Sequence, residues 1–505
     1  MAYFLSFSLQ LCNRLFTFVK HGVQIMRICL SNPAWRTNNE KGIRAGCRVP
    51  NSISHGQHTF IPFPFTLAYA MAMVEQEEGV TAMILDAIAE DLDADEYVRR
   101  VAEFKPDLVV SEMATQSHFS DIEVAKRIKV ETGAKIVLCG SHPTAIAAEI
   151  LEQHDHIDFI LLGEYELTLV ELSRRMRDGQ DTELAEGLAY RKADGQIFVG
   201  PKRALIPDLA ALPYPHRSTL PMQTYRVAGF QHPTLFMYAS RGCPYKCTFC
   251  VWPQWFKSGS YRSRTGTSVV DEIEYANREF GPFKSIYFDD DTFNLGKQRM
   301  RDMASEFKSR GMSIPWGCHA RPDQFDEEMM KNLAEAGLFN IRIGVESGDP
   351  EVLRRIKKDL DLATVQPCID LAHKYGVKVH VTFTIGLSGE SWQSVKKTVK
   401  FARKITPDSI AFTVTTPFPG TSYYDEVVEE GLLETRDWSK FNVTNSAVVR
   451  TASMSSSEIL KAEKYVVRNV YYSPRYIYRR LRYSSSPSEL FALVRKGASL
   501  FLSGV

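Results

Sequence analysis

The stretch SRGCPYKCTFCVWPQ, Ser240–Gln254, places three of the 9 cysteines of this 505-residue chain on one short segment. Cys243, Cys247 and Cys250 follow the spacing CxxxCxxC. Cysteine thiolates are soft ligands, so three of them on one loop predict a soft metal centre. An iron–sulfur cluster bound through three of its irons fits this spacing, because the remaining iron is then open to a small ligand.

Two other uses of these cysteines stay open on the residues alone. Structural zinc takes four ligands, usually in two pairs, whereas only Cys247 and Cys250 form such a pair here. A zinc site would therefore need His232 or His319 to complete it. Inert burial in a core is the third alternative.

Strand-like and helix-like segments alternate around this loop. Between the strand candidates lie helical stretches such as SVVDEIEYANREF and ATVQPCIDLAHKYG. Six such units predict a partial parallel barrel over residues 229–440, with chemistry at the carboxyl ends of its strands. The cysteine loop follows the first of these strands. The strand candidates are LFMYAS (235–240), SIYFDDD (285–291), IPWGCHA (314–320), NIRIGVES (340–347), KVHVTFTIGL (378–387) and SIAFTVTTP (409–417).

Residues 26–180 show a second alternation, in which each strand candidate is a nearly continuous apolar run. Such runs are typical of strands buried on both faces of a parallel sheet. We expect a doubly wound, Rossmann-like α/β domain whose ligand lies beyond the carboxyl ends of the strands. Residues 181–228 are expected to connect the two domains and to contain a β-hairpin with its turn at Asp194–Gly195. The strand candidates are RICLSN, TAMILDA (81–87), DLVVSEM (107–113), KIVLCGS (135–141) and DFILLGE (158–164).

Composition narrows the class of protein. A hydrophobic content of 44%, a charged content of 24% and a net charge of +1 describe a globular protein, and no global positive charge favours nucleic acid. An odd number of scattered cysteines favours a reducing cytoplasm over a disulfide framework. Residues 1–25 are apolar but interrupted by Asn13, Arg14 and Lys20, so we expect a loose extension rather than a membrane span or a secretory signal. A helix on a membrane surface is the alternative.

Four downstream segments extend the pattern of the cysteine loop: YFDDDTF, RIGVESG, FTIGLSGES and TPFPGTSYYDE. Together with CPYKCTFC, and in this order over about residues 229–425, they resemble the radical S-adenosylmethionine (SAM) superfamily, whose fold is a partial (β/α)6 barrel. The resemblance implies a [4Fe–4S] cluster on Cys243, Cys247 and Cys250. It further implies SAM contacts from Phe249, Asp289, Asp290, Asp291, Arg321, Glu346, Ser347, Gly386 and Leu387.

Most of these SAM contacts also have a structural interpretation. The aspartates suit a solvated strand end or a helix cap, and Arg321 suits an ion pair within the chain. Glu346 and Ser347 suit a structural cap, and Gly386 an ordinary turn.

The markers GSHPTA and GEYELTLVEL belong to a second resemblance. Residues 26–176 resemble the cobalamin-binding domain that precedes this barrel in one large subfamily. Relatives that replace the lower axial ligand of cobalamin carry DxHxxG, but this chain has DAIAED at Asp86–Asp91, so the resemblance implies cobalamin bound without that histidine (His-off). A domain that has lost cobalamin is the alternative, and for His142 so is a hydrogen-bonded loop histidine. The implied cobalamin contacts are Asp86, Thr115, Gly140, Ser141, His142, Gly163 and Glu164.

The combined resemblances imply an enzyme that generates a 5′-deoxyadenosyl radical from SAM and methylates an unactivated carbon. The alternative is a radical ring contraction, rearrangement or oxidative cyclisation with the same cofactors, because CVWPQ resembles radical proteins of hopanoid biosynthesis. A non-catalytic zinc-binding protein is the distant alternative. The implied partners are a small-molecule or lipid-linked substrate and a flavodoxin- or ferredoxin-type electron donor.

The C-terminal segment, residues 441–505, is expected to be helical and basic. Between Lys464 and Lys496 its only acid is Glu489, and tyrosines alternate with the basic residues. Such a segment suits peripheral contact with an anionic membrane, while a solvated helix face is the alternative. The basic residues are Lys464, Arg468, Arg475, Arg479, Arg480, Arg482, Arg495 and Lys496.

Overall fold

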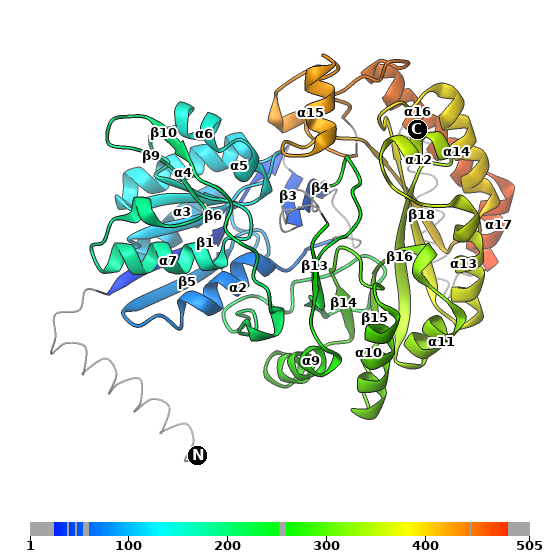
Figure 1. Ribbon diagram of the computed structural model, residues 1–505, viewed down its shortest axis with the longest axis horizontal. Helices are drawn as coiled ribbons and strands as arrows, with labels where there is room; N and C mark the ends of the chain where they lie inside the picture. Colours follow the sequence, from blue (N-terminus) through cyan, green and yellow to red (C-terminus); the bar gives the residue numbers. More distant parts are fainter. Residues whose placement is uncertain are drawn as a thin grey trace.

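The computed structural model describes residues 25–37, 40–45, 48–53, 60–251, 259–444 and 446–482. The expected N-terminal extension up to residue 24, the tripeptide Trp252–Gln254 and the basic residues beyond Arg482 lie outside these ranges. Figure 1 shows two α/β units side by side, with α15 (Ser422–Glu429) at the top between them. The expected fold class is confirmed.

The N-terminal unit is a doubly wound parallel sheet. Its parallel strands stand in the order β8-β7-β6-β1-β5, so the chain reverses direction across the sheet between β1 and β6. In such sheets the ligand crevice lies outside the carboxyl ends of the strands at this switch point. The strands are β1 (Met26–Asn32), β5 (Val80–Asp86), β6 (Leu108–Glu112), β7 (Lys135–Cys139) and β8 (Phe159–Leu161).

Helices cover both faces of this sheet (Figure 1). Local chemistry fixes some of their ends: the Asp93 side chain accepts from the Glu96 backbone N–H at the start of α3, and Gly133 ends α4 in the left-handed conformation. The helices are α2 (Phe65–Val74), α3 (Ala94–Phe104), α4 (His118–Thr132), α5 (Ser141–Ala145), α6 (Ala147–Gln153) and α7 (Glu166–Arg177).

The expected hairpin forms, but it is part of the N-terminal sheet rather than of a free connector. Strands β9 (Leu188–Arg191) and β10 (Ile197–Val199) pair antiparallel, and β9 also pairs antiparallel with β8. Leu188, Ala189 and Tyr190 are buried, so the sheet edge gains a strand that covers apolar surface. The described chain from residue 200 to β11 then links the two units.

The second unit is a curved sheet of six parallel strands in chain order, β11-β14-β15-β16-β17-β18. The two end strands of this described sheet do not pair with each other, so the barrel is partial, as expected (Figure 1). Phe288, Phe307 and Trp316 pack with their rings in its core. The strands are β11 (Thr234–Met237), β14 (Ser285–Phe288), β15 (Trp316–Ala320), β16 (Leu338–Glu346), β17 (Lys378–Ile385) and β18 (Ser409–Val414).

Helices line the outside of this sheet, and in the described chain α15 and two further α-helices follow it. The barrel helices are α9 (Gly266–Phe280), α10 (Lys297–Ser309), α11 (Glu327–Glu335), α12 (Pro350–Arg355), α13 (Val365–Lys374) and α14 (Trp392–Lys404). The expected helical C-terminal segment begins as α16 (Ser456–Tyr471), which packs against α14 and β18, and continues as α17 (Pro474–Arg482).

Two small antiparallel sheets complete the described part of the chain. Strands β2 (Arg36–Thr37), β3 (Glu40–Ala45) and β4 (Arg48–Ile53) form one of them. Strands β12 (Ser240–Gly242) and β13 (Tyr261–Ser263) form the other, and β12 leads into the cysteine loop.

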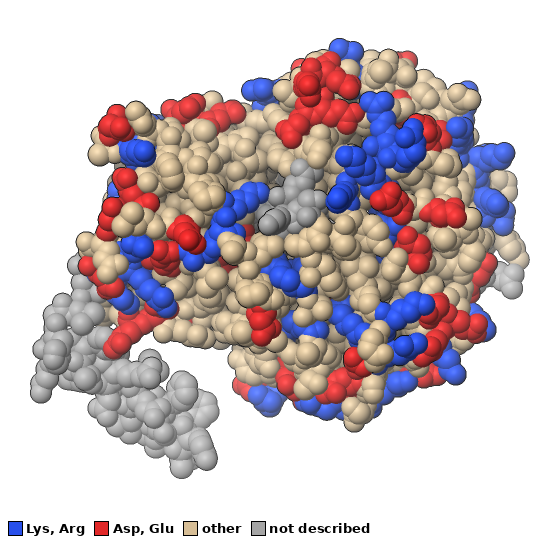
Figure 2. All heavy atoms as spheres, in the orientation of Figure 1, with Lys and Arg blue, Asp and Glu red and all other residues tan. Residues whose placement is uncertain are grey.

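The surface carries no dominant charge on the face in view. Figure 2 shows basic and acidic side chains interspersed there, in keeping with the net charge of +1. Among the helices that the structure describes, none combines the length and the apolar character needed to cross a bilayer.

Candidate functional site

The cysteine loop leaves β12 at the carboxyl end of the barrel and is anchored by backbone groups. Gly242 has φ +87°, and a Cβ there would lie 2.3 Å from the Ser260 carbonyl oxygen, so this position requires glycine. Farther along, the Thr248 N–H donates to the Ile356 carbonyl (3.0 Å), and the Tyr423 N–H donates to the Thr248 carbonyl (3.0 Å). Elements following β16 and β18 therefore fix the loop.

The donor set of the loop fits an iron–sulfur cluster. All three cysteines are reduced and partly buried, and Cys243 Sγ lies 3.4 Å from Thr292 Oγ1. Burial raises the pKa of the Cys243 and Cys247 thiols. In the described ranges no three His, Cys, Asp or Glu side chains converge as ligands of a single metal ion. A cluster needs no such convergence, because it binds each thiolate through a different iron.

The histidines that a zinc site would need are engaged elsewhere. His232 lies ahead of β11, whereas the cysteine loop follows the carboxyl end of that strand. His319 lies within β15, where its Nε2 is 2.5 Å from the Tyr287 hydroxyl. Neither arrangement supports zinc.

The three expected SAM-binding aspartates lie behind the loop. Asp290 accepts from the Ala239 N–H (3.1 Å) and from the Ser240 hydroxyl, and Asp291 accepts from the Gly242 N–H (2.9 Å). Asp289 is 3% exposed, so little of it is open to a ligand. The side chains of Asp290 and Asp291 therefore hold the turn from β11 into β12, which is the structural interpretation.

Glu346 ends β16 in a buried polar cluster that the sequence did not reveal. Its φ is +69°, a conformation that costs free energy for a residue with a side chain. The Lys358 ammonium donates to Glu346 Oε1 (3.1 Å), and the Thr384 hydroxyl donates to Oε2 (3.0 Å). The neighbouring Ser347 contacts Thr398 Oγ1 (3.3 Å) and accepts from the Asp349 N–H, so it acts as a local cap, and its contact with SAM stays a prediction.

Lys358 connects this cluster to the cysteine loop. Burial would lower the pKa of its ammonium, but the charges of Glu346 and Cys247 outweigh burial and raise it. The same cation lowers the pKa of Cys247 against the larger raising effect of burial. Lys358 follows a helix in the stretch RRIKKDLD, which carries no motif, and only proximity identifies it.

Arg321 is paired within the chain. Its guanidinium donates to both carboxylate oxygens of Asp323 (3.0 and 2.6 Å) and to the carbonyls of Lys358 and Asp359. It also stacks on the Tyr245 ring in the cysteine loop, 3.6 Å from the centroid. Arg321 thus forms an ion pair that supports the loop, and its contact with SAM stays a prediction.

The segment after β17 packs under the loop. A Cβ on Gly386 would lie 2.8 Å from Ile459 Cγ2, so the approach of α16 explains this glycine. Leu387 is fully buried in a cluster with Leu353, against which Phe249 packs. Glu390 accepts from the Gly386 N–H (2.5 Å), and burial raises its pKa to about 8.

Unused polar groups mark where a ligand would be held in the barrel. The hydroxyls of Thr415 and Thr416, just beyond β18, are buried without a hydrogen-bond partner among the described residues. A buried polar atom without a partner is costly unless a ligand or water satisfies it. These two hydroxyls therefore fit a polar ligand at the barrel mouth.

The N-terminal unit also has expected ligand contacts and a buried polar atom without a partner among the described residues, at the carboxyl ends of β6 and β7. Gly140 has φ +117°, and a Cβ there would meet the Met113 carbonyl oxygen at 2.8 Å, so the two strand-end loops touch. Ser141 begins α5. Thr115 is buried, and within the described chain the Oε1 of the next residue, Gln116, has no hydrogen-bond partner.

His142 is buried beside a histidine that the sequence analysis missed. His118 Nδ1 lies 3.0 Å from His142 Nε2, while His142 Nδ1 finds no hydrogen-bond partner in the part of the chain that the structure describes. Burial lowers the pKa of His118 to about 4 and that of His142 well below its usual value. Trp438, which follows the barrel, packs its ring against His142 at 5.1 Å. Both imidazoles are thus neutral, and the orphaned nitrogen fits a polar group of a ligand in this crevice.

The remaining expected cobalamin contacts have other partners. Asp86 accepts from Asn32, from the Ala89 N–H and from the Tyr225 hydroxyl (3.0 Å), so both its oxygens are used. Lys202 packs over Gly163, where a Cβ would lie 3.3 Å from Lys202 Cδ. Glu164 forms ion pairs with Arg241 and Arg262 of the barrel unit. All three residues therefore contact other residues of the same chain.

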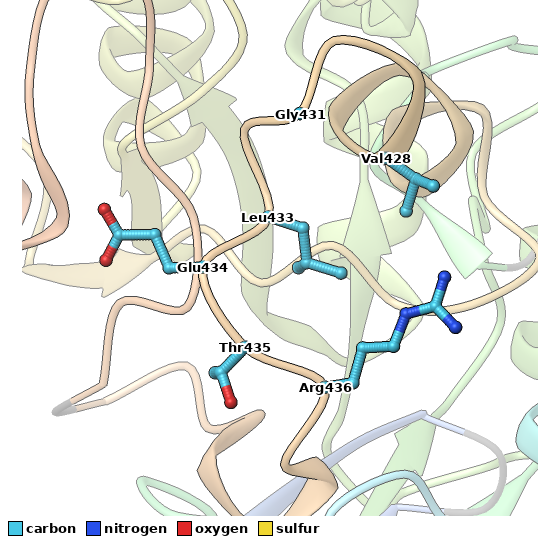
Figure 3. Close-up of a pocket in the computed structure, with 6 residues that line it drawn as sticks. All are labelled: Val428, Gly431, Leu433, Glu434, Thr435 and Arg436. Atoms are coloured by element: carbon cyan, nitrogen blue, oxygen red, sulfur yellow. The ribbon is translucent and has the colours of Figure 1, made fainter.

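A separate hollow of about 350 Å³ lies between α15 and the segment that follows it. Figure 3 shows Val428, Leu433 and Arg436 directed to the same side of this segment, with Glu434 on the other. Gly431 and Thr435 complete the lining, which includes none of the three cysteines.

Comparisons with known proteins agree with both halves of this arrangement. Residues 237–402 match the radical SAM superfamily, and residues 59–173 match the B12 binding domain. An uncharacterized methyltransferase of Pyrococcus horikoshii is 31% identical over 82% of this chain and 88% of its own length. The anaerobic magnesium-protoporphyrin IX monomethyl ester cyclase of Rubrivivax gelatinosus is 25% identical over 79% of this chain and 71% of its own.

The fold is also shared with a solved structure. That structure is OxsB, a cobalamin-dependent S-adenosylmethionine radical enzyme, with aqua-cobalamin and S-adenosylmethionine bound. Its TM-score is 0.71 at 16% identity, covering 94% of this chain and 71% of OxsB.

Proposed function

This chain belongs to the radical SAM superfamily and carries a B12-binding domain ahead of its barrel, and on that basis we propose that it methylates an unactivated carbon. The substrate is a small-molecule or lipid-linked precursor, and a flavodoxin- or ferredoxin-type protein supplies electrons. When bound, the cluster and SAM supply a 5′-deoxyadenosyl radical and cobalamin supplies a transferable methyl group. The observation that carries the proposal is the three-cysteine loop, which follows a strand whose Arg241 pairs with Glu164 at the carboxyl edge of the doubly wound sheet.

The residues of the chain divide the work in this proposal. Cys243, Cys247 and Cys250 hold the cluster. Lys358 keeps a positive charge beside Cys247, and its ion pair with Glu346 holds the carboxylate in place at the end of β16. The buried hydroxyls of Thr415 and Thr416 satisfy polar groups of SAM or substrate.

In the N-terminal unit we assign cobalamin to the crevice at the carboxyl ends of β6 and β7. His142 Nδ1 and Gln116 Oε1 are the buried polar atoms that such a ligand would satisfy. Because DAIAED lacks a histidine, the lower face of cobalamin takes no ligand from that motif.

A direct test needs no substrate. The protein is reconstituted anaerobically with iron, sulfide and cobalamin, reduced, and given SAM labelled in its methyl group. Methyl transfer predicts that label is recovered on cobalamin and that S-adenosylhomocysteine forms beside 5′-deoxyadenosine. A protein that binds neither iron nor cobalamin would refute the proposal.

The second candidate is a rearrangement or oxidative cyclisation with the same cofactors, favoured by the similarity to the cyclase of Rubrivivax gelatinosus. In that case 5′-deoxyadenosine forms while no label leaves SAM for cobalamin or product. The same labelling experiment therefore separates the two reactions.

We also propose that the C-terminal segment contacts an anionic membrane surface. In α17, Arg475 is exposed, and so are Ile477 (43%) and Tyr478 (61%). Helices with exposed apolar and basic residues bind anionic interfaces. Co-sedimentation with phosphatidylglycerol vesicles but not with phosphatidylcholine vesicles is expected, and equal recovery with both would contradict this contact.

A further inference from the structure

We infer that a buried ion-pair network joining Glu164, Glu166, Arg241 and Arg262 is a positioning device that holds the cysteine loop in register with the cobalamin crevice. The inference rests on the proposed function, because it concerns how the two cofactor sites are held relative to each other. It gives these four residues a role in methyl transfer between the sites rather than in binding either cofactor.

The network crosses between the two units and excludes water. Arg241 Nη1 lies 2.8 Å from Glu164 Oε1 and 2.7 Å from Glu166 Oε1, and the three side chains are 5%, 1% and 0% exposed. Arg262 Nη1 lies 2.9 Å from Glu164 Oε2 and donates to the Ile206 carbonyl (2.5 Å). The Tyr69 ring of α2 lies 4.8 Å from the Arg241 guanidinium.

Both arginines sit on the strand pair that carries the cysteine loop. Arg241 and Arg262 are direct partners across β12 and β13, and Arg241 is two residues from Cys243. A shift of this strand pair would therefore move the first cysteine with it.

Both glutamates sit at the carboxyl edge of the N-terminal sheet. Glu164 follows β8, and Glu166 is the first residue of α7. This edge also carries His142, at the start of α5 after β7. The network thus links the edge expected to hold cobalamin directly to the strand expected to hold the cluster.

Charge explains why this link is rigid. Burial would raise the pKa of Glu164, but Arg241 and Arg262 outweigh it and keep the carboxylate ionised. Replacing Arg262 takes one of its two cations from the buried Glu164, and replacing Glu164 takes the carboxylate from Arg262; losing a buried partner is costlier than losing a surface pair. One guanidinium nitrogen, Arg241 Nη1, contacts both Glu164 and Glu166, so the two carboxylates are held against a single point of the strand.

The chain offers a matched control directly after the same strand. The Arg264 guanidinium, next but one to Arg262, forms a buried ion pair with Glu272 of α9, so this pair stays within the barrel unit. Arg264→Gln and Arg262→Gln therefore both break a buried pair, but only Arg262→Gln breaks one that joins the two units. Glu164→Gln keeps the side-chain shape and provides a milder variant should Arg262→Gln fold poorly.

The test uses anaerobically reconstituted full-length protein with cobalamin and reduced cluster. Two readouts depend on the distance between the sites: the relaxation enhancement of the cob(II)alamin electron paramagnetic resonance signal by the cluster, and the ratio of S-adenosylhomocysteine to 5′-deoxyadenosine. We expect Arg262→Gln and Glu164→Gln to lower this ratio about tenfold and to weaken the enhancement, with iron and cobalt contents retained. Arg264→Gln should keep both readouts at wild-type values.

The outcomes separate the inference from the proposed function. If loaded Arg262→Gln and Glu164→Gln match Arg264→Gln in both readouts, the network only stabilises the fold and the inference is overturned alone. If wild-type protein takes up no iron or no cobalamin, the proposed function fails and the inference fails with it.

Discussion

The barrel mouth and the N-terminal crevice are each expected to hold a cofactor, but their side chains are engaged differently. At the barrel mouth, backbone bonds and the side chains of Asp290 and Asp291 hold the cysteine loop, so most of the expected ligand contacts are engaged with the chain. In the crevice, neutral buried imidazoles at His118 and His142 leave one nitrogen without a partner among the described residues. The comparison teaches that the fixed loop presents its thiols, whereas other ligand contacts in both regions come from buried polar atoms without a partner among the described residues, at Thr415 and Thr416 in the barrel and at His142 in the crevice.

The largest expected effect is at the barrel mouth, where a substitution in the cysteine loop removes a cluster ligand. Cys247→Ala removes one of three thiolates, and we expect loss of bound iron and a fall of at least about 100-fold in 5′-deoxyadenosine, since the loop sequence offers no fourth cysteine to replace it. Iron analysis and product formation measure the two. Cys318→Ala, a buried cysteine of β15, is the control and should retain iron. Normal iron content in Cys247→Ala would contradict a cluster bound by Cys247.

A smaller effect is expected from the cation beside the loop. Lys358→Met leaves Glu346 buried without its partner, and we expect SAM affinity to fall about tenfold, equivalent to about 1.4 kcal/mol. Equilibrium dialysis with labelled SAM measures it. Lys397→Met breaks the ion pair with Asp349, in which the lysine side chain is 51% exposed, and should leave the affinity unchanged. Equal affinities in the two variants would show that Lys358 has no part in the site.

On the barrel side, Glu390 should make the stability of the protein depend on pH. The pKa of Glu390 is about 8 in the folded chain against 4.5 ordinarily, so the folded state keeps a proton that the unfolded state has released. Stability should therefore fall between these values as pH rises, by up to about 1.4 kcal/mol per unit. Asp349, whose charge also raises this pKa, stays in place in Glu390→Gln. Urea unfolding at several pH values should show a flatter dependence in that variant, and an unchanged slope would contradict a neutral Glu390.

In the crevice, His118 should give the smallest effect, a loss of stability as pH falls rather than as it rises. The pKa of His118 is about 4 against an ordinary 6.5, so the unfolded state takes up a proton that the folded state refuses. Stability then falls between these values as pH drops, again by up to about 1.4 kcal/mol per unit. His154 and His142 face the same ring and remain in His118→Asn. That variant should reduce the loss of stability as pH drops from 6.5 to about 4, whereas Glu390→Gln should reduce the loss as pH rises from 4.5 to about 8. The two variants therefore change the pH dependence in opposite directions, and each controls for the other.

Sequence alone identified the loop because its signal is local. The spacing of Cys243, Cys247 and Cys250, and the alternation of apolar strands with helices, depend on residues close together in the chain. The same reasoning misplaced the hairpin at Leu188–Val199, because only the pairing of β9 with β8 assigns it to the sheet. It also missed the ion pairs of Glu164 with Arg241 and Arg262, because a glutamate at a strand end has no visible partner until the other unit is in place.

The alternation of strands and helices, the cysteine spacing and the missing DxHxxG histidine were determined by the sequence, since each is a pattern of neighbouring residues. Tertiary structure alone decided that Lys358 faces Glu346, that His118 pairs with His142, and that Arg241 reaches Glu164, 77 positions away. The physical reason is that the energetic effect of a charge or of an unpaired polar atom depends on its burial and on its partners. Both arise only when distant segments pack together.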